Sequence, residues 1–182
     1  MRDEVLETAR VLIQSAGVDG FSYADIAKQL DIRPPSIHHH FASKADLVAE
    51  VAELYRRDFV DKISLIQGET VHDRLCAYAR LFDEPASSGL VCLCGAIAAE
   101  WPHIPDGARH HVEVFFAEQQ TWLSEEIASG VASGEFRSGI DADAVAQLVL
   151  ASLEGSMLMA RAGTTSQLAH STMTTLLSTL SR

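Results

Sequence analysis

The sequence predicts an all-α protein, in which a short three-helix N-terminal unit precedes a helical bundle. Apolar residues recur at steps of three and four along most of the 182 residues, and the alternation typical of β-strands is absent. Clusters of glycine and proline interrupt this pattern and mark the helix ends. Since 47% of the side chains are hydrophobic, the chain can bury a substantial core.

The first predicted helix covers residues 3–16. Val5, Ala9 and Ile13 share one face of it, acidic residues occupy its first turn, and Gly17 follows its end. After a short loop, Ser22 can cap a second helix that runs to about residue 30. These two segments predict one long amphipathic helix followed by a short one.

A third, very short helix is predicted in the segment IRPPSIHHHF, residues 32–41. Pro34 disfavours helical backbone at Arg33, whereas Pro35 suits the first turn of a helix. Ile37 and Phe41 are four residues apart and are expected to face the core. The polar residues around them must therefore project sideways or outward.

Longer helices are expected in the rest of the chain. Ser43 can cap a helix from about Lys44 past Phe59, and no flexible linker follows. We place the domain boundary inside this helix, so that residues 1–46 form one domain and residues 47–182 the other. Further helices are predicted near residues 70–83, 87–100, 106–133, 141–162 and 165–181.

Two short helices joined by a tight turn, behind a longer helix, form the frame of a helix-turn-helix, which presents its second short helix to the major groove. The segment FSYADIAKQLDIRPPSIHHHFASKADLVAEV resembles the N-terminal DNA-binding domain of TetR-family transcriptional regulators, a likeness that covers about residues 5–52. GEFRSGIDADAVAQLVLASLEG resembles the approach to that family's penultimate helix. The resemblance implies a homodimeric repressor that a small-molecule inducer releases from a palindromic operator.

The resemblance also implies which residues contact DNA. Ser22 and Lys44, each at the start of a helix, are expected to contact phosphate, because helix N-termini direct amides at anions. Two departures from the family pattern are Asp31, at a turn position usually held by glycine, and His38, at a position often held by tyrosine. Aspartate tolerates a left-handed turn, so the fold is expected to survive. The expected DNA-binding set is Ser22, Tyr23, Arg33, Ser36, His38, His39 and Lys44.

The charge of the chain limits its affinity for DNA. A formal net charge of -11 opposes phosphate binding when it is taken alone. Between residues 27 and 48, however, Lys28, Arg33 and Lys44 outnumber Asp31 and Asp46. A weakly basic head on an acidic body is compatible with DNA binding and predicts modest non-specific affinity.

Metal binding is the alternative hypothesis. Consecutive residues on a helix diverge by about 100 degrees, so His38, His39 and His40 cannot converge on one ion. The Glu-x-x-His pairs Glu69/His72 and Glu100/His103 match a signature of di-iron helical bundles, although both lie at helix ends. We therefore favour a regulator over a metal-binding protein or metalloenzyme. The sequence contains no common nucleophile or nucleotide motif, so we expect no enzyme activity and no cofactor.

The cysteines and the N-terminus predict a cytoplasmic protein. Cys76, Cys92 and Cys94 are an odd number of cysteines and are expected to be reduced, with the last two buried in apolar surroundings. MRDEVLETAR lacks the basic and then apolar order of a signal peptide. No uninterrupted apolar run reaches the roughly 18 residues of a membrane span, so we expect no membrane partner.

The C-terminal helices supply candidates for effector binding and dimerisation. For the effector residues the alternative is ordinary core packing, while Glu154 needs a partner if it is buried. The expected effector-binding residues are Phe82, Leu93, Trp101, Phe115, Gln119, Trp122, Glu154 and Met157. The expected dimer interface comprises Val145, Leu148, Val149, Ser152, Gly155, Met159, Leu168, Met173, Leu176, Leu177 and Leu180. Two heads would then reach half-sites about 34 to 36 Å apart.

Overall fold

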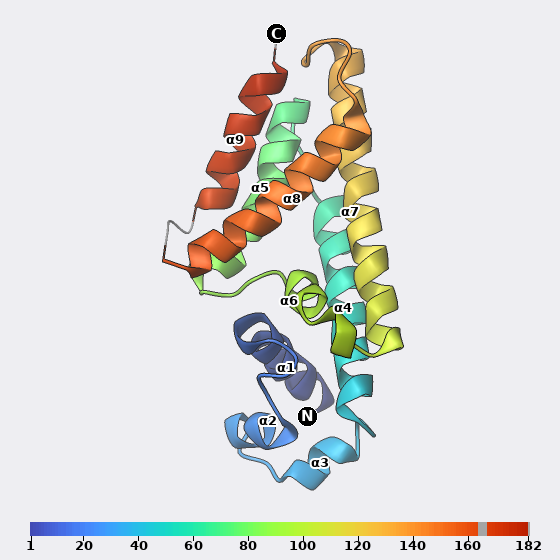
Figure 1. Cartoon of the computed structure of the whole chain (residues 1–182), viewed down its shortest axis with the longest axis vertical. Coiled ribbons are helices and arrows are strands. Elements are labelled where there is room, and N and C mark those ends of the chain that lie inside the picture. Colours follow the sequence, from blue (N-terminus) through green and yellow to red (C-terminus); the bar gives the residue numbers. More distant parts are fainter. Residues whose placement is uncertain (164–166, 182) are drawn as a thin grey trace. The chain divides into compact units, whose positions relative to one another are not determined.

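The computed structural model describes residues 1–163 and 167–181, and every regular element within these residues is a helix (Figure 1). An isolated antiparallel bridge between Phe136 and Ser181 is the one strand-like pairing among them. The prediction of an all-α fold is confirmed.

Two compact units can be distinguished. The first unit comprises residues 1–59 and 92–115, and the second comprises residues 60–91 and 116–182. Helices α4 (Lys44–Ser64) and α7 (Asp106–Ser133) contribute residues to both units. The boundary predicted near residue 46 stays a prediction about the extent of the DNA-binding domain.

The first unit contains the expected three-helix head. The backbone turns at Gly17, with φ of 82°, and at Asp31, with φ of 53°, so aspartate does adopt the left-handed turn. Arg33 is extended, and the two prolines after it occupy the start of the short helix. The elements of this unit besides α4 and α7 are α1 (Arg2–Ala16), α2 (Tyr23–Gln29), α3 (Pro34–His38), α6 (Leu93–Ala99) and the 3₁₀ turn η1 (Trp101–His103).

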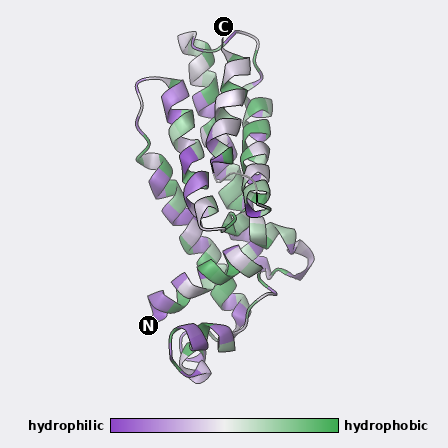
Figure 2. Ribbon diagram, turned by 90° about the vertical axis from the view of Figure 1, so that its left-hand side faces the viewer, coloured by the Kyte–Doolittle hydropathy of each residue, from purple (hydrophilic) through white to green (hydrophobic). Residues whose placement is uncertain are grey.

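The second unit is built around α5 (Val71–Ser87), α8 (Ala142–Arg161) and α9 (Leu168–Leu180). Both α8 and α9 pack against α5 and against each other (Figure 1). Hydrophilic and hydrophobic residues alternate along the helical ribbons in Figure 2, as amphipathic helices require. Helices α1 and α5, for example, each have an apolar face whose residues are buried.

Two predicted helix ends were wrong. The helix expected to stop at residue 83 continues through Pro85 to Ser87, since a proline in the last turn removes only one hydrogen bond near the helix end. The helix expected from residue 87 begins at Leu93 instead, because the chain turns at Gly89, with φ of 71°. The helix predicted from residue 165 is described from Leu168, and residues 164–166 lie outside the described part.

Candidate nucleic-acid interface

The short helix α3 presents a polar surface. Ile37 is buried with 0% exposure and Phe41 with 2%, as the spacing predicted. Because these two side chains hold α3 against the core, the residues between and before them point outward. The residues expected to line the groove are all exposed, namely Arg33, Ser36, His38 and His39.

The start of α2 carries a capping box. Ser22 is exposed, and its hydroxyl and backbone N–H donate to the Asp25 carboxylate at 2.6 and 2.8 Å. The side-chain and backbone hydrogen bonds from Ser22 lower the pKa of Asp25, so this carboxylate is ionised. A phosphate contact by Ser22 therefore requires its hydroxyl to turn away from Asp25.

Tyr23 joins the two short helices rather than extending freely into solvent. Its hydroxyl donates to the Phe41 carbonyl at 3.3 Å, and its ring meets the edge of the His38 ring at a centroid distance of 4.7 Å. Partial burial raises the pKa of Tyr23. Tyr23 therefore positions α3 and, through it, the exposed imidazole of His38.

Lys44 lies at the start of α4 and is half-buried. Its ammonium donates to the Phe21 carbonyl and lies 4.3 Å from the centroid of the Phe21 ring. An ammonium has three N–H donors, so this contact leaves others for a phosphate. The charge of Lys44 is thus held in place beside the start of α2.

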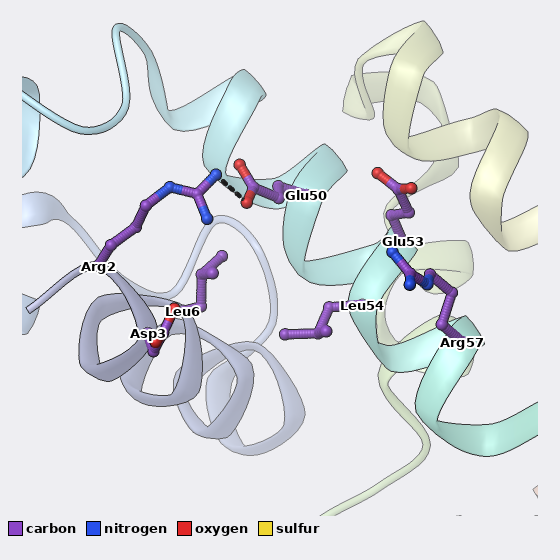
Figure 3. Close-up of a pocket in the computed structure, with 7 residues that line it drawn as sticks. All are labelled: Arg2, Asp3, Leu6, Glu50, Glu53, Leu54 and Arg57. Carbon is purple, nitrogen blue, oxygen red and sulfur yellow. Dashed lines mark hydrogen bonds and ion pairs between the residues drawn. The ribbon is translucent and has the colours of Figure 1, made fainter. Parts of the chain in front are cut away.

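A groove of about 220 Å³ lies between α1 and α4 (Figure 3). Arg2 spans it, pairing with Glu50 on α4 while its guanidinium lies 5.3 Å from the centroid of the Phe41 ring. Farther along α4, Glu53 and Arg57 are drawn near each other. Because the Arg2–Glu50 pair is exposed, it contributes little stability, and charges of both signs line this groove.

Glu100 holds the loop between α1 and α2. One carboxylate oxygen accepts from the Val18 N–H and the other from the Asp19 N–H, both at 2.8 Å. Glu100 is half of one of the two Glu-x-x-His pairs, but its carboxylate is bound to backbone amides rather than directed at a metal site. No local sequence signal could reveal this contact, because the partners are about 80 residues apart.

The structure gives the metal-binding alternative no further support. Among residues 1–163 and 167–181, no group of three or more histidine, cysteine, aspartate or glutamate side chains could hold a metal ion. In the other Glu-x-x-His pair, Glu69 and His72 are both exposed at the start of α5.

Three expected effector residues meet around Tyr78, a residue that the sequence analysis missed. The Tyr78 hydroxyl donates to the Gln119 Oε1 at 2.7 Å, and its ring stacks on that of Trp122 at a centroid distance of 5.0 Å. The ring of Phe82 lies 5.4 Å away. Gln119 has 0% exposure, and its Nε2 has no hydrogen-bond partner within the described part of the chain.

The other expected effector residues lie on other parts of the fold. Phe115 belongs to the first unit, where it packs against Tyr55 and Phe59. Trp101 also lies in the first unit, where the Arg109 guanidinium is 5.5 Å from the centroid of the Trp101 ring. Three residues remain: Leu93 is buried in α6, Met157 is buried in α8, and Glu154 is half-buried in α8.

Helix α8 carries an exposed apolar face. Leu148, Leu158 and Met159 are 54%, 62% and 55% exposed, and a Cβ atom at Gly155 would meet nothing within 4 Å. By length and composition alone α8 could cross a membrane, but this test is weak evidence, because helices of soluble proteins also pass it. Of the other expected interface residues, Val145, Ser152, Leu168 and Leu176 are half-buried, whereas Val149, Met173, Leu177 and Leu180 are buried in the chain's own core.

The three cysteines are buried and unbridged. Burial raises the pKa of the Cys76 thiol, which disfavours the reactive thiolate. Cys92 caps α6, where its sulfur accepts from the Gly95 N–H at 3.4 Å. The expectation that Cys92 and Cys94 are buried is confirmed.

Two family models match the chain. The model described as "Bacterial regulatory proteins, tetR family" matches residues 5–51, which include every residue of the expected DNA-binding set. The model described as "Tetracyclin repressor-like, C-terminal domain" matches residues 69–176. Together they cover most of the chain.

Curated and solved relatives agree with the family models. The chain is 28% identical over 166 residues to the HTH-type transcriptional repressor KstR2 of Mycolicibacterium smegmatis, a match that covers 81% of this chain and 73% of the relative. A TetR-family transcriptional regulator from Agrobacterium tumefaciens has a similar structure, with a TM-score of 0.93, 30% identity, and coverage of 100% of this chain and 97% of that one. A regulator from Legionella pneumophila shares the fold, with a TM-score of 0.87, 23% identity, and coverage of 99% and 97%.

Proposed function

The chain belongs to the TetR family of bacterial transcriptional regulators, and from this premise we propose that it is a repressor that a small molecule releases from a palindromic operator. As a member of this family it is a DNA-binding transcriptional regulator. The operator, the effector, the cytoplasmic location and the absence of enzyme activity belong to the proposal.

The observation that carries the proposal is the exposed polar surface of α3. Ile37 fixes this helix from behind, and Arg33, Ser36 and His39 remain free to reach base edges in the major groove. Lys44 and the start of α2 flank that surface, where they can contact phosphate and set the register of the head on the duplex.

A second copy of the chain is the proposed partner at α8. Exposed Leu148, Leu158 and Met159 form an apolar face, and Gly155 allows a neighbouring helix to approach closely. A two-fold dimer built on α8 and α9 would present two heads to a palindrome. A dimer interface on α8 would also remove its exposed apolar side chains from water.

The Tyr78 cluster supports an effector site in the second unit. A buried amide without a partner costs about 1 to 3 kcal/mol, and a ligand oxygen beside Gln119 would remove that cost. The rings of Tyr78, Phe82 and Trp122 favour a flat, apolar body next to the oxygen. An effector that binds better to a form with wrongly spaced heads lowers operator affinity by the same coupling energy.

Selection of duplexes from a random DNA pool tests the proposal. The purified protein is incubated with the pool at moderate salt, and the enriched sequences are then titrated with it. We expect a palindrome with half-sites about one helical turn apart, roughly 34 to 36 Å. A folded dimer that enriches no sequence, at any salt concentration and with no effector added, would contradict the proposed repressor.

A further inference from the structure

We propose that Glu100 is a positioning residue that ties the DNA-binding head to α6 and thereby fixes the half-site spacing that the dimer accepts. This inference rests on the proposed function, since it concerns how two heads meet one operator. The name Glu100 clamp is used below for the Glu100 carboxylate together with the N–H groups of Val18 and Asp19.

The Glu100 clamp uses both carboxylate oxygens. Each oxygen accepts one backbone N–H at 2.8 Å, so the two bonds define the orientation of the loop as well as its distance. Hydrogen bonds to an ionised carboxylate are roughly twice as strong as bonds between neutral groups. A paired contact of this kind resists both sliding and rotation of the loop.

The loop is shaped around the carboxylate. Gly17 has a positive φ of 82°, and a Cβ atom there would lie 2.1 Å from the Glu100 Oε1. Val18, whose N–H belongs to the clamp, and Phe21, two residues after Asp19, are buried with 6% and 4% exposure. The loop therefore moves with α6 as one body, and it carries the start of α2 with it.

The Glu100 clamp joins two parts of the sequence that the family models treat separately. Glu100 is the C-cap of α6 and falls within the segment 69–176, whereas Val18 and Asp19 fall within the segment 5–51. Ser22 lies only three residues after Asp19, at the start of the helix proposed to contact phosphate. A rotation of α6 would thus be passed directly to the reading head.

Operator duplexes that differ in half-site spacing test this role. Glu100→Gln replaces one accepting oxygen by an amide nitrogen, which cannot accept from an N–H. Glu113→Gln is the matched control, because Glu113 is exposed in the same unit and the substitution removes the same charge. Affinities are measured for the selected palindrome, for versions lengthened or shortened by about one and two base pairs, and for a single half-site.

For Glu100→Gln we expect about a tenfold loss of affinity for the optimal palindrome, which lies within the usual range of coupling between sites. Binding to a single half-site should stay within about twofold, because the head itself is intact. The differences in affinity between palindromes of different half-site spacing should become smaller than in the wild-type protein. Equal losses for the half-site and for every spacing would show that Glu100 only stabilises the fold, and unchanged affinities would likewise overturn the proposal.

Gly17→Ala provides a second variant that leaves Glu100 in place. The added Cβ would overlap the carboxylate and would also strain the backbone, whose φ is positive at this position, so the loop has to leave Glu100 and the same flattened dependence on spacing is expected. A sharp, wild-type dependence on spacing in a folded Gly17→Ala dimer would contradict the proposal. These outcomes are separate from the proposed function, which fails only if the wild-type protein selects no palindrome.

Discussion

At the scale of single residues, Lys44 is expected to contribute sequence-independent affinity. We expect Lys44→Ala to weaken binding to operator and random DNA alike, and to reduce the slope of log affinity against log salt by about one unit. The check is a titration of both duplexes over a range of salt concentrations. Lys62→Ala is the control, because Lys62 is an exposed lysine at the far end of α4. An unchanged salt slope for Lys44→Ala would remove this residue from the DNA-binding set.

His39 is expected to contribute sequence preference instead. It is exposed near the end of α3, where a side chain can reach a base edge. We expect His39→Ala to relax the preference at one or two operator positions, so that a mismatched base pair there costs less than the usual value of about 1 to 3 kcal/mol. Repeating the selection with this variant measures the change, and His110→Ala, at another exposed histidine, serves as the control. An identical selected sequence would mean that His39 reads no base.

The exposed residues of α3 could be predicted because local spacing decides them. Once Ile37 and Phe41 are assigned to the core, the directions of their neighbours follow from helix geometry. The contacts that hold Tyr23 and Lys44 could not be predicted in this way. Each contact is made to a backbone carbonyl that folding brings close. Every residue has such a carbonyl, so the sequence does not show which one will be the partner.

At the scale of elements, the start of α5 is held from two sides. The hydroxyl of Thr70 accepts from the Asp73 N–H at 3.0 Å and donates to the Asp73 carboxylate at 2.7 Å. The carboxylate of Glu135, from the loop after α7, accepts from the Val71 N–H at 2.8 Å. Together these groups satisfy N–H donors that the first turn of a helix leaves without a partner.

We expect Thr70→Ala to lower the free energy of unfolding by about 1 kcal/mol, the usual cost of losing a side-chain cap. Urea denaturation followed by circular dichroism measures the change. Thr70→Ser keeps the hydroxyl and should retain most of the stability. If Thr70→Ala were as stable as Thr70→Ser, the Glu135 carboxylate alone would suffice to cap α5.

The sequence predicted helix positions well where breaks were strong and poorly where they were ambiguous. The long helix expected at 106–133 has these bounds in the structure. The sequence placed a helix break at Pro85, but this proline lies in the last turn of α5. A proline there costs the helix little stability, and the sequence alone does not show that the helix ends so soon after it. Cys92 was not expected as a cap, since cysteine is not among the preferred N-cap residues.

At the scale of the whole molecule, we expect the exposed apolar face of α8 to decide the oligomeric state. We expect Leu148→Glu to convert the dimer to a monomer, because it places a charge in the proposed apolar interface. Sedimentation velocity measures the change. Leu65→Glu is the matched control, since Leu65 is 77% exposed and lies outside α8 and α9. A dimer that survives Leu148→Glu would place the interface elsewhere.

The family and its fold could be predicted from the sequence, whereas the interface and the effector site stay predictions. Helical periodicity identifies apolar faces without showing which face the chain itself covers. For that reason Val149, Met173 and Leu177 were expected in the interface but lie in the core, while Leu158 was overlooked and is exposed. Tyr78 was missed as well, although it binds the one buried glutamine that the sequence analysis selected for the effector.

The fit between Gly17 and Glu100 also limits how this chain can evolve. While the carboxylate occupies the space beside position 17, any side chain there would collide with it. Homologues that keep the glutamate should therefore keep the glycine, whereas loss of the glutamate removes the collision and leaves only the backbone strain of a side chain at positive φ. Loss of the glutamate must come first, because the opposite order passes through an intermediate in which the two side chains overlap. The two positions should covary in an alignment of relatives, although about 80 residues separate them in the sequence.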